Sequence, residues 1–175
     1  MKKAKLLWVD LEMTGLSPEK DRILEIAAIG TGWDLKNLCE FTAIVKVSES
    51  LMKERMVGDF WEKNTESRDS LMKQNSQGED IKEVEQKFLK YLEKNFSEEI
   101  ILAGNSIHQD RKFIDRELPA VSERLHYRML DVSAWKVYFE NVLKKKFVKP
   151  EEHRALSDIQ GSIEEFKYYL TFIKR

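Results

Sequence analysis

The order of the apolar runs constrains the fold of this chain more than any other feature of its sequence. Three β-rich runs follow one another at short spacing near the start, over residues 5–13, 22–33 and 40–47. Short connections favour antiparallel neighbours, so these runs predict a three-stranded meander. Gly15 and Pro18 suit a turn between the first two runs.

From residue 80 onward the pattern changes to an alternation of helix and strand. The spacing predicts helices over residues 80–96, 109–118 and 134–143, with strands over 100–105 and 129–133. A last helix, from about residue 154, carries an apolar stripe of Leu156, Ile159, Ile163, Phe166, Leu170 and Ile173. A meander followed by this alternation predicts an α/β fold, a ribonuclease-H-like mixed five-stranded sheet flanked by helices.

Length and composition agree with a single domain over residues 1–175. The chain is 42% hydrophobic, which is enough for a substantial core. No window approaches the roughly 18 apolar residues of a membrane helix, and the apolar start is too short for a secretory signal. Cys39 is the only cysteine, so no intrachain disulfide can form and we expect a cytoplasmic protein.

The charge balance narrows the possible substrates. Lys and Arg total 30 and Asp and Glu total 31, for a formal net charge of −1. Proteins that wrap a long nucleic acid usually carry a basic excess, because each phosphate contact is a Lys or Arg that displaces counterions. The balance therefore favours a short nucleic acid, or a locally basic pocket, over a long one.

Two carboxylates interrupt the first apolar run, LLWVDLEMTGL. Asp10 and Glu12 are two residues apart on a predicted strand, so their side chains share a face. About five acid-x-acid pairs are expected by chance in a chain this acidic, and a strand end that projects into solvent would also explain the pair. Within an apolar strand, however, ionised carboxylates cost several kcal/mol each unless a partner neutralises them.

Two more acids stand beside apolar helix stripes. Asp110 falls in the first turn of its predicted helix, where the helix dipole alone would also stabilise an acid. Asp158 lies at the edge of the last stripe, five residues after His153. His126 and Asp131 have the same offset, so spacing does not choose between the two pairs.

Four such carboxylates with no compensating lysine nearby in sequence point to divalent cations. Hard oxygen ligands select Mg²⁺ or Mn²⁺, whereas one Cys and scattered His offer no closed zinc site. Two ions about 3.5–4 Å apart are a known arrangement for phosphodiester hydrolysis, and a histidine suits the task of general base. We therefore expect two metal ions beside Asp10 and Glu12, with His153 as the base.

Three short blocks, DLE, GNSIHQD and HRALSD, resemble in order and spacing the motifs of the DEDDh 3′→5′ exonucleases. The longer blocks WVDLEMTGL, DRILEIA, LAGNSIHQDRKF, LHYRMLDVS and HRALSDI resemble oligoribonucleases, from residue 7 to about residue 169. The resemblance implies an enzyme dependent on Mg²⁺ or Mn²⁺ that releases 5′-mononucleotides from the 3′ end of very short RNAs, down to dinucleotides. It implies His153 as general base and two metals held by Asp10, Glu12, Asp110 and Asp158.

The resemblance also implies substrate contacts and a second subunit. Leu16 would wedge between two bases and Trp61 would stack on one. The other matching substrate positions are Asn105, Ser106, Tyr127, Arg128 and Ser133. The family's HYR block reaches the neighbouring subunit's site, so the resemblance implies a homodimer. Each residue has a plain alternative: Leu16 as a loop hydrophobe, Trp61 as a core side chain, Tyr127 and Arg128 as surface.

Two other functions stay open on the sequence. One is a DEDDh exonuclease that processes or proofreads longer DNA or RNA 3′ ends, which relative rates on a dinucleotide and a twenty-mer would distinguish. The other is a non-catalytic nucleic-acid-binding domain, which the intact acids and histidine argue against.

Overall fold

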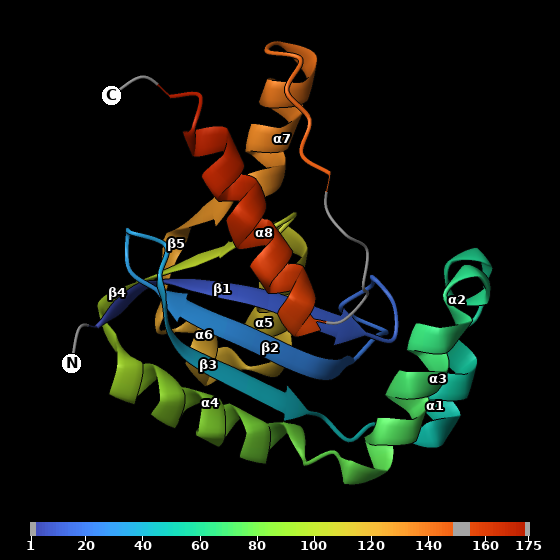
Figure 1. Ribbon diagram of the computed structural model, residues 1–175. Coiled ribbons are helices and arrows are strands. Elements are labelled where there is room, and N and C mark those ends of the chain that lie inside the picture. Colours follow the sequence, from blue (N-terminus) through green and yellow to red (C-terminus); the bar gives the residue numbers. More distant parts are fainter. Residues whose placement is uncertain (1–2, 149–154, 174–175) are drawn as a thin grey trace.

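The protein is built on a five-stranded mixed sheet, described here by a computed structural model that covers residues 3–148 and 155–173 (Figure 1). The strands are β1 (Ala4–Met13), β2 (Ile23–Thr31), β3 (Asn37–Ile44), β4 (Phe96–Gly104) and β5 (Leu125–Asp131), in the order β3-β2-β1-β4-β5. The pairs β3–β2 and β2–β1 are antiparallel, and β1–β4 and β4–β5 are parallel. The α/β fold class, the five strands and the initial meander predicted from the sequence are confirmed.

Helices occur between β3 and β4, between β4 and β5, and after β5. They are α1 (Glu49–Arg55), α2 (Asp59–Lys63), α3 (Thr65–Gln74), the 3₁₀ turn η1 (Asn75–Gln77), α4 (Ile81–Asn95), α5 (His108–Glu117), α6 (Pro119–Ser122), α7 (Val132–Asn141) and α8 (Ala155–Leu170). In Figure 1 the helices α1, α2 and α3 gather beside one end of the sheet. The predicted boundary between the fifth strand and the next helix was wrong. The carboxylate of Asp131 accepts a hydrogen bond from the Ser133 amide and caps α7, which therefore begins at Val132, two residues before the predicted start.

The two faces of the sheet carry separate cores. On one face, Leu7, Val9 and Leu11 of β1 pack with α4, α5 and α6. On the other, Leu6 and Trp8 pack with α7 and α8, and Figure 1 shows α8 running across this face. Successive strand residues point to opposite faces, so positions 10 and 12 continue the α8 face at the end of β1.

A difference in strand length creates an open edge on β1. The pairing with β4 reaches Trp8 opposite Ala103, and β4 ends at Gly104, whereas β1 continues to Met13. A Cβ atom at Gly104 would lie 2.9 Å from the carbonyl oxygen of Val9, so glycine permits this close approach to β1. The carboxyl ends of parallel strands in open α/β sheets commonly border a ligand crevice.

The buried side of α8 differs from the predicted apolar stripe. Ile159, Ile163 and Phe166 are buried as expected, but Leu170 is partly exposed. Glu165 lies in the interior with them. The predicted start of this helix near residue 154 lies outside the described residues. Among the residues that the structure describes, no helix is both long enough and apolar enough to cross a membrane.

Candidate active site

Three carboxylates converge where β1 passes under the first turn of α8. One oxygen from each of Asp10, Glu12 and Asp158 lies within 4.8 Å of the others, and all three side chains are half-buried. Oxygen ligands of one octahedral Mg²⁺ ion lie about 3 Å apart when adjacent and about 4 Å when opposite, as follows from bonds of 2.0–2.1 Å. A small closure of the three carboxylates would meet that geometry, so the donor set fits a hard divalent cation.

Asp110 approaches the same strand from α5. It is almost fully buried, and its Oδ1 accepts a hydrogen bond of 3.0 Å from the backbone amide of Leu11. Leu11 stands between Asp10 and Glu12 on the part of β1 that β4 does not reach, so the carboxylate of Asp110 takes the place of a strand partner. Asp110 is nevertheless outside the group of three that lies within 4.8 Å.

The local electrostatics of Asp110 suit a nearby cation. Burial raises the pKa of its carboxyl to about 7, and the charge of Asp131 adds to this, while the hydrogen bond from Leu11 opposes it. A positive charge beside Asp110 would favour the ionised form and lower the pKa again. A divalent ion bound beside Asp110 would therefore favour loss of its proton, and the ionised carboxylate could then act as a ligand.

The predicted general base, His153, lies outside the described residues, so its place in the site stays a prediction. The competing pair from the sequence was His126 with Asp131. In the structure, Nδ1 of His126 accepts the Arg128 amide at 3.1 Å. Asp131 accepts the backbone amide of Ser106 at 3.0 Å, and its other carboxylate oxygen lies 3.6 Å from Nδ1 of His108.

Three of the predicted substrate contacts meet at the ends of β4 and β5. The Ser106 amide also donates to Ser133 Oγ at 2.8 Å, and the two hydroxyl oxygens lie 3.1 Å apart. Ser106 has a positive φ of 49°, which turns the chain sharply after β4. Asn105, the preceding residue, donates from Nδ2 to Glu165 at 2.8 Å. Asn105, Ser106 and Ser133 thus lie at the end of the sheet where β4 and β5 finish and where β1 carries Asp10 and Glu12.

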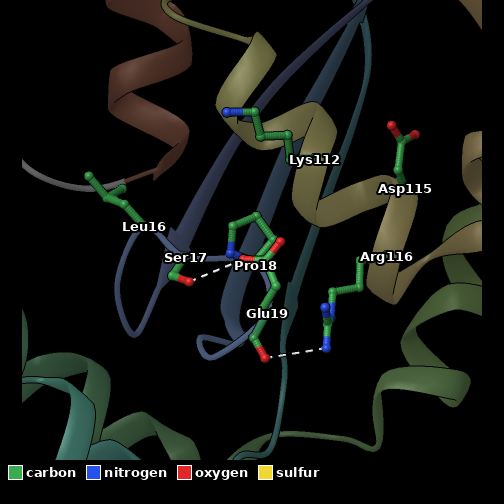
Figure 2. A pocket seen from close by; sticks show the side chains of 7 residues that line it. All are labelled: Leu16, Ser17, Pro18, Glu19, Lys112, Asp115 and Arg116. Carbon is green, nitrogen blue, oxygen red and sulfur yellow. Dashed lines mark hydrogen bonds between the residues drawn. The ribbon is translucent and has the colours of Figure 1, made fainter.

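Leu16 lies in the loop that follows β1, and its side chain is 72% exposed. Its carbonyl oxygen accepts a 2.6 Å hydrogen bond from Nε2 of Gln109, the neighbour of Asp110. The loop and α5 border an open pocket of about 730 Å³, and Figure 2 shows Leu16 and Asp115 at its opposite ends. Arg116 closes one side by donating to the Glu19 carbonyl at 3.3 Å.

Trp61 lies in the core, which is the alternative that the sequence left open. Only 5% of its surface is exposed, and its indole N–H donates to the Thr14 carbonyl at 3.2 Å. The adjacent Phe60 is 62% exposed and packs edge-on against Trp61, with ring centroids 5.0 Å apart. Stacking of Trp61 on a base stays a prediction.

Tyr127 and Arg128 lie on the outer strand, β5, and both are exposed. The Arg128 guanidinium lies 5.1 Å from the centre of the Tyr127 ring, which the His126 ring also contacts. No described contact joins either side chain to Asn105, Ser106 or Ser133 of the same chain. Their contribution to a neighbouring subunit's site stays a prediction.

The sequence reasoning missed two residues that border this site. Gln109 ties the Leu16 loop to α5, and Glu165 binds Asn105 from within α8. A signal for Glu165 was present, because it follows Asp158 by seven residues and precedes Tyr169 by four. This spacing places all three on one side of a helix. No comparable signal marked Gln109.

Comparisons with known proteins find relatives over most of the chain. Residues 7–166 match the RNase_T family model, which is described as exonuclease. The chain is 39% identical over 170 residues to the oligoribonuclease of Chromobacterium violaceum, covering 94% of this chain and 92% of that protein. It is 38% identical over 170 residues to the oligoribonuclease of Coxiella burnetii, with coverage of 94% and 91%.

Solved structures share the fold at low sequence identity. Escherichia coli Exonuclease I, in complex with a dA16 oligonucleotide, has a TM-score of 0.68 and 12% identity, over 97% of this chain and 41% of that one. The Exonuclease I of Methylocaldum szegediense has a TM-score of 0.63 and 16% identity, over 91% and 38%. This chain thus spans about two fifths of the exonuclease I chains.

Proposed function

Because the chain belongs to the oligoribonuclease family of DEDDh exonucleases, we propose that it is a divalent-metal-dependent 3′→5′ exoribonuclease acting in RNA degradation. Its substrates would be very short RNAs, from dinucleotides to short oligonucleotides, and its products 5′-mononucleotides. The observation that carries this proposal is the convergence of Asp10, Glu12 and Asp158 within 4.8 Å. Residues 1–175 would act as a single exonuclease domain.

The chain's own residues have distinct tasks in this mechanism. Asp10, Glu12, Asp110 and Asp158 would hold two Mg²⁺ or Mn²⁺ ions. Bound ions of this kind supply charge stabilisation at a phosphate and a more acidic water. His153 would accept the proton of the attacking water, since a histidine titrates near neutral pH. Asp110 has a second task, because its hydrogen bond to Leu11 fixes α5 to the strand that carries Asp10 and Glu12.

The neighbouring polar groups suit a short nucleic acid. Asn105 and the hydroxyls of Ser106 and Ser133 would bind substrate oxygens, because they lie where β4 and β5 end, at the end of the sheet where β1 carries Asp10 and Glu12. Exposed Leu16 would pack between the two bases, and Trp61 would support the base site from the core. The net charge of −1 agrees with few phosphate contacts.

A homodimer forms part of this proposal. Tyr127 and Arg128 are exposed on the edge strand of the sheet, which would allow them to reach the site of a second copy. There the Tyr127 ring would offer a stacking surface and Arg128 a phosphate contact. A cytoplasmic location stays a prediction based on the single cysteine.

The test is hydrolysis of a labelled RNA dinucleotide and a labelled RNA twenty-mer with Mg²⁺. Asp158→Asn is the loss-of-site variant, and Glu164→Gln, at an exposed position on the same helix, is its control. We expect fast cleavage of the dinucleotide that Asp158→Asn abolishes and Glu164→Gln retains. Faster cleavage of the twenty-mer would favour a processing or proofreading exonuclease instead. No cleavage by folded protein with either Mg²⁺ or Mn²⁺ would contradict the proposal.

A further inference from the structure

A buried carboxylate lies two helical turns beyond Asp158 on α8. Glu165 is 1% exposed, and its Oε1 accepts a 2.8 Å hydrogen bond from the Tyr169 hydroxyl. Its Oε2 accepts Asn105 Nδ2 at 2.8 Å, and the Lys136 ammonium lies 3.8 Å from Oε1. Taking such a group out of water costs several kcal/mol, and apolar replacements of buried ion pairs are often as stable or more so. Stability alone therefore does not explain an acid here.

The partner of Glu165 stands at a structural junction. Asn105 directly follows the last residue of β4 and precedes Ser106, where φ is positive. Gly104 brings this end of β4 against the Val9 carbonyl of β1. The hydrogen bond from Asn105 to Glu165 thus joins α8 to the point where β4 leaves β1.

The spacing along α8 connects this junction to the acids. Asp158 and Glu165 are seven residues apart, which in an α-helix is about 10.5 Å along the axis and about 20° short of two full turns. The side of the helix that faces Asn105 is therefore the side that brings Asp158 to Asp10 and Glu12. A slip of one residue would turn Asp158 by about 100° and remove it from the group.

Apolar packing alone restrains such a slip weakly. Ile159, Ile163 and Phe166 hold α8 on the sheet, but the hydrophobic effect is non-directional and follows the area buried. The 2.8 Å hydrogen bond from the Asn105 side chain, which belongs to the turn after β4, has a direction and a length. Buried polar groups of this kind are best known for setting the register of packed helices.

We propose that Glu165 is a positioning residue for the metal site. Its hydrogen bond to Asn105 sets the register of α8 against β4 and so holds Asp158 within reach of Asp10 and Glu12. Tyr169 and Lys136 stabilise the Glu165 charge from the other side. The inference rests on the proposed function to the extent that these three acids bind the metal.

The test compares Glu165→Leu and Glu165→Gln in the full chain, with Glu164→Gln as control. Glu164 is exposed and contacts Lys167 on the same helix. The readouts are the melting temperature without metal and the Mn²⁺ affinity from calorimetric titration. Glu165→Leu should fold with a lower metal-free melting temperature, because the buried Tyr169 hydroxyl and the Asn105 amide lose their acceptor. It should also bind Mn²⁺ about tenfold or more weakly, the range typical of residues that orient metal ligands.

Glu165→Gln should restore most of this affinity. Its amide oxygen can accept the Asn105 N–H, and its amide N–H can donate to the Tyr169 oxygen, so both contacts keep a partner. Tyr169→Phe retains the bond to Asn105 and should bind Mn²⁺ like the wild type. A purely structural role would instead move stability and metal affinity together in all of these variants.

Two results would overturn the inference. One is wild-type Mn²⁺ affinity in folded Glu165→Leu. If that variant does not fold, Asn105→Ala removes the other half of the bond, and wild-type affinity there would have the same meaning. The other result comes from hydrogen exchange, which tests the register of α8 without metal. It is the deciding measurement if the wild type binds no Mn²⁺, a result that would count against the proposed function alone. Faster exchange around residues 158–162 in Glu165→Leu than in Glu164→Gln supports the inference, and equal exchange refutes it.

Discussion

Replacing Arg55 by methionine tests how the loop after β1 is held. Asp21 is fully buried and accepts hydrogen bonds from Thr14 Oγ1 at 3.0 Å and from the Ser17 amide at 2.9 Å. Arg55 of α1 supplies two more, from Nε at 2.8 Å and from Nη2 at 3.2 Å. This pair connects the loop that carries Leu16 to the helices beside the sheet.

The expected loss follows from the burial of the two partners. Removing one partner of a buried ion pair costs about 3–5 kcal/mol, because the other charge is left in the interior. The Arg55 side chain is 29% exposed and Asp21 keeps its bonds to Thr14 and Ser17, so we expect about 2–3 kcal/mol. At about 2–4 °C per kcal/mol for a chain of this size, the melting temperature should fall by about 4–12 °C.

The pH dependence gives a second signature. Burial raises the pKa of Asp21, but the hydrogen bonds from Arg55, Ser17 and Thr14 outweigh burial and hold the pKa below its usual value of 3.8. A carboxyl with a lowered folded-state pKa contributes stability above its unfolded pKa, and this stability is lost as the pH falls through the lowered value. The difference between wild type and Arg55→Met should therefore be full at pH 7 and shrink below about pH 4.

Urea unfolding at pH 7 and pH 3 measures both effects. Asp21→Asn and the double variant complete a mutant cycle, from which we expect a coupling energy above about 1 kcal/mol. Lys53→Met is the control, since Lys53 lies on the same helix in an exposed pair with Glu49. The reasoning fails if Arg55→Met loses no more stability than Lys53→Met, or if the cycle shows no coupling.

Three further outcomes follow from individual side chains. Burial raises the pKa of Glu117 from 4.5 to about 7, so this group makes the protein less stable as the pH rises through that window. In urea unfolding, the free energy of unfolding should fall between pH 4.5 and pH 7.5, and Glu117→Gln should reduce this fall by about 1–2 kcal/mol, a figure lowered for the partial exposure of Glu117. An unchanged pH dependence in Glu117→Gln would contradict this. Phe88→Ala should cost about 3–5 kcal/mol in the same assay, because the buried ring stacks on Phe41 at 4.7 Å, and a loss below about 1 kcal/mol would count against this packing. Tyr127→Ala should lower dinucleotide turnover roughly tenfold, the worth of one stacking contact, without changing the melting temperature; wild-type rates would exclude a role across the dimer.

The elements that the sequence predicted well are those with periodic burial. In β1 the side chains alternate between two buried faces, and in α4 Val84, Phe88 and Leu92 recur at helical spacing. Such periods survive in the sequence because each buried position must be apolar. The start of α7 was predicted less well, since a single side-chain contact at Asp131 decides it. The short helices α1 and α2 each bury a single residue, Met52 or Trp61, which leaves no period to detect.

The candidate site could be located in the sequence but not assembled from it. Acids inside apolar patterns identified Asp10, Glu12, Asp110 and Asp158 as unusual, because burial of charge is costly wherever it occurs. Sequence gives no distances, so it did not show that Asp110 binds the β1 backbone while the other three acids lie together. For Trp61 the pattern left both core and stacking open, since an aromatic side chain satisfies either environment.

The arrangement of the acids depends on where β4 stops. If β4 continued beside β1, its backbone would occupy the Leu11 amide, and Asp110 would have no place at the strand edge. The sharp departure at Gly104 and Ser106 frees that edge, and the same turn presents Asn105 to Glu165. The turn after β4 thus leaves the Leu11 amide of β1 free for Asp110, and it also holds α8, the helix that carries Asp158. The acids come together because the end of β1, the start of α5 and one face of α8 are all held near the point where β4 leaves β1.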